Sequence, residues 1–131
     1  NLDADLQVQV KNNIRVFAVP AYLESIVLNI ISNALRYRSD QRIPQLIISS
    51  NDDNSGTIKI VFEDNGLGID LSKNGDKIFK LYKKFHQNAE AKGVGLYITK
   101  NQCEAMNGSI QVMSEVGIGS TFVVSLLRAQ N

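Results

Sequence analysis

Two carboxamides lie one helical turn apart in the stretch Leu28-Asn29-Ile30-Ile31-Ser32-Asn33-Ala34-Leu35-Arg36-Tyr37, where most other residues favour burial. At about 3.6 residues per turn, one stripe of a helix here carries Asn29, Asn33 and Arg36. Tyr37 lies beside this stripe. The adjoining arc is apolar and consists of Leu23, Ile26, Ile30 and Ala34. The pattern therefore predicts a helix that packs on a core with its amides along the seam.

The polar stripe of this helix needs partners, because an unpaired buried amide costs several kcal/mol. One interpretation is that the asparagines bond to neighbouring backbone. Two carboxamides, a guanidinium and a phenol on one stripe favour a polar ligand instead. The amide oxygens suit a hard cation, and the guanidinium suits phosphate.

Length and composition are those of one globular domain, with 131 residues, 44% hydrophobic and 21% charged. The net charge of +1 argues against a nucleic-acid partner. Cys103 is the only cysteine, which excludes an internal disulfide and a thiolate metal cage. A lone cysteine also fits a reducing compartment.

The beginning of the chain and the length of its apolar runs indicate in which cellular compartment the domain is expected. No run approaches the roughly 20 residues that span a bilayer, and no signal peptide is evident. Because the first residue is Asn1 rather than Met, we expect a domain from a longer protein. We expect it in the cytoplasm, either free or as the cytoplasmic portion of a membrane-anchored sensor.

Alternating apolar and polar residues predict the other elements. Residues 6–10 and 14–19 favour a small hairpin or edge pair, and Pro20 suits the first turn of the long helix, which we expect to reach about Tyr37. The further expected elements are strands at 45–50, 57–63, 110–114 and 120–127, and a helix at 94–106 closed by Asn107-Gly108. The mixed order favours an α+β fold, a two-layer sandwich with about three helices on one face of a mixed sheet.

A second chemical feature is the segment Asp64-Asn65-Gly66-Leu67-Gly68-Ile69, directly after an expected strand. A carboxylate at a strand end, followed by glycines, lets a planar ligand approach the backbone closely. Asp64 can accept a hydrogen bond from an exocyclic amine such as adenine N6, whereas guanine offers a carbonyl there and is rejected. The alternative is a plain turn, because Asp-Asn-Gly is a common turn signal.

Two further glycine-containing segments favour contact with a nucleotide. The segment Lys92-Gly93-Val94-Gly95-Leu96 enters an expected helix, whose free N–H groups and dipole favour phosphate. It is neither a Walker A loop nor a full dinucleotide fingerprint, and a simple loop–helix junction is the alternative. The segment Gly119-Ser120-Thr121-Phe122 can place a hydroxyl near a base edge, or can be merely a turn entering a strand.

In this order, the segments resemble the catalytic and ATP-binding domain of bacterial sensor histidine kinases, within the Bergerat-fold (GHKL) ATPases. The resemblance covers essentially the whole chain and implies one kinase domain over residues 1–131. The matched motifs are the N box at 29–37, the first glycine box at 64–68, the F box at 78–85, the second glycine box at 93–96 and a Gly-Thr element at 119–121.

The resemblance implies ATP and Mg²⁺ as cofactors. Asn33 would bind the metal, with Asn29 assisting. Arg36 would meet phosphate, and so would Lys84, which stands where the family commonly has an arginine with its planar fork. The implied catalytic residues are thus Asn29, Asn33, Arg36 and Lys84.

The resemblance also implies a nucleotide-binding set and a lid. Asp64 would recognise the adenine amine, Tyr37 would pack by the sugar or base, and Thr121 would support Asp64. The polar segment 71–92 would be an ATP lid with a short helix and few buried contacts. The full binding set is Asn29, Asn33, Arg36, Tyr37, Asp64, Gly66, Gly68, Ile69, Lys92, Gly93, Val94, Gly95, Leu96 and Thr121.

One residue separates the reaction classes within this family. In the ATP-hydrolysing relatives the first N-box position is a glutamate that activates water, whereas Asn29 cannot act as a general base. The implied acceptor is therefore a histidine on the dimerisation domain of the same protein, which would be a homodimer serving a response regulator in two-component signalling. We expect His86 to be a lid residue rather than that acceptor. The alternatives are a Bergerat-fold ATP hydrolase and a non-catalytic nucleotide-binding or docking module.

Overall fold

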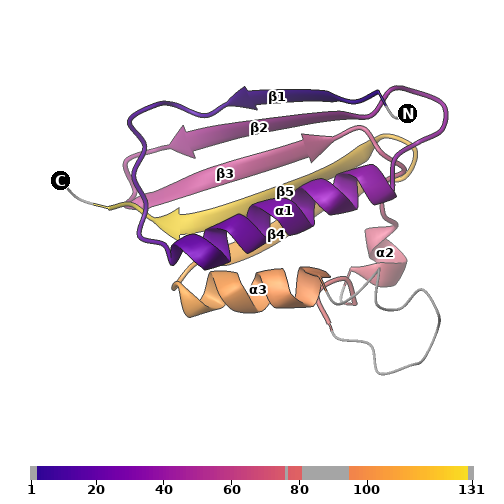
Figure 1. Cartoon of the computed structure of the whole chain (residues 1–131). Helices are drawn as coiled ribbons and strands as arrows, with labels where there is room; N and C mark the ends of the chain where they lie inside the picture. Colours follow the sequence, from indigo (N-terminus) through magenta and orange to yellow (C-terminus); the bar gives the residue numbers. More distant parts are fainter. Residues whose placement is uncertain (1–2, 76, 81–94, 130–131) are drawn as a thin grey trace.

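The structure, a computed structural model, describes residues 3–75, 77–80 and 95–129. These residues form one five-stranded sheet with helices packed on one of its faces (Figure 1). The strands are β1 (Asp5–Gln9), β2 (Gln45–Asp52), β3 (Thr57–Asp64), β4 (Ser109–Glu115) and β5 (Gly119–Leu127), and the helices are α1 (Pro20–Arg36), α2 (Leu71–Asn74) and α3 (Gly95–Ala105). The predicted α+β sandwich is confirmed, and so are the long helix and the paired strands.

The order of strands in the sheet is β1-β2-β3-β5-β4, with β1 and β2 parallel and the other neighbours antiparallel. Directly paired residues of antiparallel strands share a face of the sheet. Phe62 pairs with Phe122, and both are buried under the helices. Two residues further along β3, Asp64 pairs with Ser120, so these two side chains lie on the helix-covered face.

The predicted hairpin between 6–10 and 14–19 is wrong. Strand β1 pairs with β2 in parallel, with Leu6 beside Leu46, and the second segment contributes only an isolated bridge from Val16 to Arg128. A parallel pair needs a long crossover, which α1 provides between β1 and β2. Alternation identified the strand, but it carries no information about a partner about 40 residues away.

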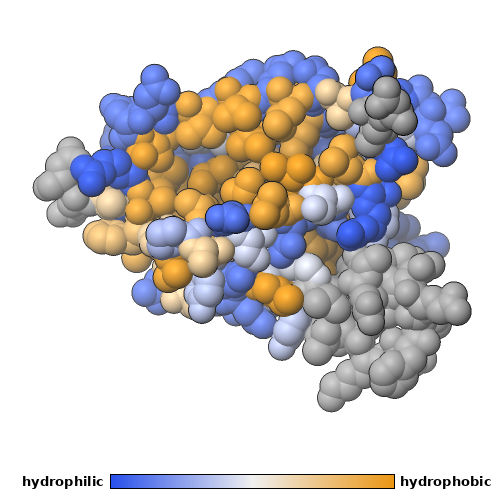
Figure 2. Space-filling view, viewed as in Figure 1, coloured by the Kyte–Doolittle hydropathy of each residue, from blue (hydrophilic) through white to orange (hydrophobic). Residues whose placement is uncertain are grey.

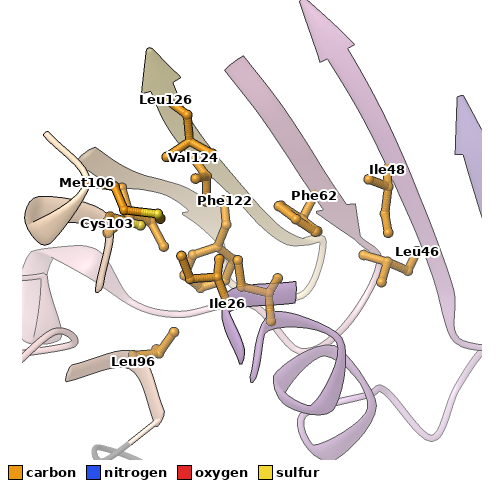
Figure 3. Packing of buried hydrophobic residues seen from close by; sticks show 12 residues of the cluster. Ile26, Leu46, Ile48, Phe62, Leu96, Cys103, Met106, Phe122, Val124 and Leu126 are labelled. Atoms are coloured by element: carbon orange, nitrogen blue, oxygen red, sulfur yellow. The ribbon is translucent and has the colours of Figure 1, made fainter. Parts of the chain in front are cut away.

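The core lies between the sheet and helices α1 and α3. On α1, Ile26 and Ile30 are fully buried, and Leu23 and Ala34 pack against the same cluster, as the apolar arc predicted. Figure 3 shows Ile26 facing the ring of Phe122 on the sheet. The core therefore fixes the rotation of α1, and with it the direction of the asparagine stripe.

Helix α3 begins at Gly95 and ends close to the predicted position. Asn107 adopts φ +58°, and the Gly108 amide donates to the Cys103 carbonyl at 2.8 Å, which closes the last turn. The thiol of Cys103 is fully buried, and burial raises its pKa to about 11. This cysteine is therefore a core residue of α3.

The helices leave the β1 side of the sheet open. Leu6 and Val8 remain 54% and 63% exposed, and Leu28 on α1 is 54% exposed. Figure 2 shows apolar side chains at the surface over this part of the molecule, above α1. None of the helices in the described ranges is long and apolar enough to cross a membrane.

Candidate functional site

The end of helix α1 and the loop after β3 are in direct contact. Tyr37 follows the last residue of α1, and its carbonyl accepts a hydrogen bond from the Leu67 amide at 2.9 Å. A Cβ added to Gly66 would stand 2.7 Å from the same carbonyl oxygen. The glycine therefore allows the two backbone segments to touch, which brings the N box and the first glycine box together.

Asp64 stands at the end of β3 and is half-buried. Its Oδ1 accepts hydrogen bonds from the amides of Gly66 at 2.9 Å and Ser120 at 3.2 Å. Burial raises the pKa of Asp64, and the two amide hydrogen bonds act in the opposite direction. Both bonds use Oδ1, so among the described residues no hydrogen bond occupies Oδ2, which can accept one from a ligand.

Two glycines allow this loop to pack on the turn between β4 and β5. Gly68 has φ +78°, and an added Cβ would collide with the carbonyl oxygen of Glu115. Gly119 has φ +147°, and an added Cβ would collide with the carbonyl oxygen of Asp64. Side chains at both positions are excluded by the protein's own backbone. Close approach of a ligand to Gly66 and Gly68 stays a prediction.

Thr121 is not brought to Asp64. It pairs with Glu63, and alternation along β5 places its side chain on the face opposite the helices. Ser120 is the hydroxyl residue that pairs with Asp64, and its side chain is buried. The residue of segment 119–122 that lies next to Asp64 is therefore one position earlier than predicted, and contact of this segment with a nucleotide stays a prediction.

Ser114 is a residue that the sequence interpretation missed. Its hydroxyl accepts from the amide of Ile69 at 2.7 Å, donates to the carbonyl of Gly119 at 2.9 Å and lies 2.7 Å from the Ser120 hydroxyl. It thereby joins the loop after β3 to the start of β5. The signal was available, since the strand pair predicted at 110–114 and 120–127 aligns Ser114 with Ser120.

Arg42 is the second missed residue. Its guanidinium donates to carbonyl oxygens of Asn65, Gly66, Gly117 and Ile118, at 2.7 to 3.4 Å. These carbonyls belong to the loop after β3 and to the β4–β5 turn. No sequence signal marks this arginine, because it lies in a polar loop and all its partners are backbone atoms.

Asn29 connects α1 with the start of α3. Its Nδ2 donates to the carbonyl of Gly95 at 3.3 Å and to Oγ1 of Thr99 at 3.2 Å. Asn29 is half-buried, and these bonds connect the N box to the start of α3 in the second glycine box. The hydrogen bonds use the amide nitrogen, so the carboxamide oxygen has no hydrogen-bond partner within the described ranges.

The other residues of the stripe follow along α1. Asn33 is half-buried, and within the described part of the chain no residue hydrogen-bonds to its carboxamide. Arg36 is exposed in the last turn. Burial raises the pKa of Tyr37, while the adjacent Arg36 guanidinium lowers it. The carboxamide oxygens of Asn33 and Asn29 are hard ligands suited to Mg²⁺, which usually keeps waters and takes substrate phosphates as its other ligands.

The predicted lid is anchored at its first part. Helix α2 starts it, and the Phe79 ring packs edge-on against Phe122 with centroids 6.5 Å apart. Ile78 also packs against the core, so these two residues make apolar contacts, and the expectation of few buried contacts over 71–92 stays a prediction. Leu96 of the second glycine box is buried in the core. The predicted site residues that lie outside the described residues are Lys84, Lys92, Gly93 and Val94, and His86 lies there too.

Comparison with known proteins yields one family and several relatives. The family described as "Histidine kinase-, DNA gyrase B-, and HSP90-like ATPase" matches residues 18–130. Hybrid signal transduction histidine kinase B of Dictyostelium discoideum is 32% identical over 105 residues, which are 76% of this chain and 5% of that protein. The autoinducer 2 sensor kinase/phosphatase LuxQ of Vibrio parahaemolyticus is 29% identical over 131 residues, 90% of this chain and 14% of that protein.

A solved structure shares the fold. Full-length ShkA in complex with AMPPNP superposes with a TM-score of 0.80 at 21% identity, over 98% of this chain and 26% of that one. The chain thus spans a small part of each of these proteins.

Proposed function

Because the chain belongs to the histidine kinase-, DNA gyrase B- and HSP90-like ATPase family, we propose that it binds ATP with Mg²⁺ and delivers the γ-phosphate to a histidine. It would be the catalytic domain, over residues 1–131, of a longer sensor kinase. The acceptor histidine would lie on the dimerisation domain of that parent, a homodimer whose response regulator takes the phosphoryl group next. Relatives that are histidine kinases support this reaction class.

The hydrogen bonding of the Asp64 carboxylate is the main support for the proposal. Its Oδ1 is held by two backbone amides, and its Oδ2 has no hydrogen bond among the described residues. The carboxylate lies where the loop after β3 meets the end of the asparagine-bearing helix. An adenine amine donating to Oδ2 would be recognised by a charge-assisted bond, and a guanine carbonyl would be repelled. The complex of ShkA with AMPPNP agrees with nucleotide binding by this fold.

The phosphate chain would extend from the base towards α1 and the start of α3. Magnesium, when bound, supplies positive charge that offsets the charge of the phosphates. Asn33 would hold it through its carboxamide oxygen, with Asn29 assisting. Arg36 and Lys84 would add positive charge at the γ-phosphate. Catalysis by these residues would consist of alignment and charge neutralisation.

The chemistry of Asn29 favours transfer over hydrolysis. An amide cannot take a proton from water, so the site has no general base at the first N-box position. In the proposed transfer, an imidazole nitrogen of the acceptor histidine on the dimerisation domain attacks the γ-phosphorus. The bond from that phosphorus to the bridging oxygen breaks, and ADP leaves with the electron pair.

Labelled ATP tests this proposal in three incubations: the chain alone, its His86→Ala variant, and the chain with the histidine-bearing dimerisation domain of its parent. We expect label on the dimerisation domain only. Label on the isolated chain that disappears in His86→Ala would make His86 the acceptor. Rapid release of free phosphate without a partner would assign the chain to the hydrolases, and nucleotide binding without label or phosphate release would indicate a non-catalytic module.

A further inference from the structure

The Arg42 guanidinium joins two loops that are distant in sequence. Its Nε donates to the Asn65 carbonyl at 2.7 Å, and its Nη2 donates to the carbonyls of Gly66 at 2.8 Å and Gly117 at 2.9 Å. A longer contact of 3.4 Å reaches Ile118. One planar fork therefore spans the gap between the loop after β3 and the β4–β5 turn.

The Asn65–Gly66 peptide unit lies between Arg42 and Asp64. Its carbonyl accepts from Arg42 Nε at 2.7 Å, and its N–H donates to Asp64 Oδ1 at 2.9 Å. The carbonyl and N–H of a trans peptide point in opposite directions, and the described residues contain no cis peptide bond. The cation, the peptide and the carboxylate thus form a chain of hydrogen bonds in which each bond strengthens the next.

The Gly119–Ser120 peptide unit also holds Oδ1 of Asp64. Its carbonyl accepts from the Ser114 hydroxyl at 2.9 Å, and its N–H donates to Asp64 Oδ1 at 3.2 Å. Arg42 binds the turn just before this unit, through Gly117 and Ile118. Arg42 therefore contacts one of the two peptide units that hold Asp64 and the turn that leads into the other, and Ser114 holds that second unit.

The charge of Arg42 is directed at these carbonyls. The ion pairs of the described residues are Lys100 with Glu104 and Arg128 with Asp52, and neither includes Arg42. None of these pairs gives Arg42 a carboxylate partner, and its guanidinium polarises the Asn65–Gly66 peptide, whose N–H donates to Asp64 Oδ1. A lysine ammonium lacks the planar fork that spans both loops.

We propose that Arg42 is a positioning residue for adenine recognition: it fixes the Asn65–Gly66 peptide unit and the turn that leads into the Gly119–Ser120 unit, and these two units orient Asp64. The inference rests on the proposed function, because it names what holds the base-recognising carboxylate in place. Loss of the guanidinium would leave Asp64 present but displaced, so the preference for adenine over guanine would fall. A merely structural arginine would change stability and leave that preference unchanged.

A double-mutant cycle on this chain tests the proposal. Calorimetry gives the dissociation constants of Mg²⁺-ADP and Mg²⁺-GDP for wild type, Arg42→Met, Asp64→Asn and the double variant. The matched control is Arg128→Met, which removes the same charge and a 3.1 Å bond to Asp52 at the other end of β5. Thermal unfolding of each variant confirms that it is folded at the temperature of the titration.

We expect Arg42→Met to lower the ADP-to-GDP preference about ten- to a hundredfold, the scale of one hydrogen bond to a charged group. Arg128→Met should leave the preference unchanged. In the Asp64→Asn background, Arg42→Met should produce no further loss, because Arg42 acts through that carboxylate. If Arg42→Met does not fold, Arg42→Lys takes its place in the cycle. The ADP-to-GDP preference of Arg42→Lys must then also be lower than that of wild type.

An unchanged preference in a folded Arg42 variant would overturn the inference. So would an equal effect of Arg128→Met, or a full effect of Arg42→Met in the Asp64→Asn background. These results leave the proposed function intact as long as the wild type binds ADP in preference to GDP. A wild type that binds neither nucleotide, or both equally, overturns the proposed function and this inference with it.

Discussion

Asp64 is held by two backbone amides, one from the loop after β3 and one from the start of β5, whereas the Asn33 carboxamide is hydrogen-bonded to none of the described residues. These residues mark the base end and the phosphate end of the proposed site. At the base end, Arg42 and Ser114 donate hydrogen bonds to backbone carbonyls of the segments that hold Asp64. At the phosphate end, the Asn29 side chain donates through its nitrogen to Gly95 and Thr99, and the Asn33 side chain has no such bond within the described ranges.

The contrast suggests a division of roles in the proposed site. The base end would select adenine, and the phosphate end would contribute Mg²⁺-dependent affinity. A carboxylate fixed before the ligand arrives discriminates between bases without an ordering cost at the moment of binding. In the proposed site, coordination of Mg²⁺ at the phosphate end would need the phosphates themselves, because Mg²⁺ usually takes part of its ligands from the substrate. We therefore expect the base end to keep its geometry on binding and the phosphate end to change.

The largest expected effect is at Gly68, where the backbone packing of the base end is tightest. Gly68→Ala adds a Cβ against the Glu115 carbonyl at φ +78°, and should cost about 3–5 kcal/mol of unfolding free energy from strain and collision together. Gly56→Ala is the matched control, since Gly56 has φ +93° with open space, and should cost about 1–2 kcal/mol. Denaturant unfolding measures both, and equal losses would contradict the described packing.

Alanine variants of Asn33 and Asn29 should differ in which property they lose, Mg²⁺-dependent ATP binding or stability. Asn33→Ala should weaken Mg²⁺-dependent ATP binding by about tenfold or more, while stability changes by less than about 0.5 kcal/mol. Asn29→Ala should cost about 1 kcal/mol of stability, because its Nδ2 bonds to Gly95 and Thr99 are lost. Calorimetry with Mg²⁺ or EDTA, together with thermal unfolding, checks both. Unfolding of Asn33→Ala, or normal Mg²⁺-ATP binding by it, would make Asn33 structural.

Acidification should affect the base end at a higher pH than an ordinary aspartate would. Burial raises the pKa of Asp64 above the usual 3.8, so the carboxylate is protonated earlier as the pH falls. Charge-assisted recognition of adenine is then lost as the pH falls through this raised pKa. For stability the sign is opposite: the contribution of Asp64 is present below its unfolded pKa and is lost as the pH rises through the folded one.

The carboxyl carbon resonance of Asp64 measures this titration directly. Its midpoint should lie above 3.8, and the loss of Mg²⁺-ADP affinity in wild type relative to Asp64→Asn should follow it. A midpoint at or below 3.8 would mean that the amide hydrogen bonds outweigh burial.

The sequence predicted those features that depend on local pattern. The apolar arc placed Ile26 and Ile30 in the core, and the strands at 45–50 and 57–63 follow from alternation. The partner of β1 could not be predicted, because pairing across α1 is decided by tertiary packing.

At the site, the motifs predicted where to look but not which atoms meet. Thr121 was placed near Asp64, and a difference of one residue along β5 puts it on the other face. Arg42 left no signal, since its partners are backbone carbonyls 23 to 76 residues away. The catalytic and binding roles given to the motif residues stay predictions.

The central claim is that the base end is complete before a nucleotide arrives, and amide hydrogen exchange of the nucleotide-free chain tests it most directly. The Gly66 and Ser120 amides donate to Asp64, and the Asn54 amide is the control, donating to Asp52 at 2.9 Å in an exposed turn. We predict that Gly66 and Ser120 exchange about 100-fold more slowly than Asn54, and change little on addition of Mg²⁺-ADP. Exchange as fast as at Asn54 until nucleotide is added would contradict the account.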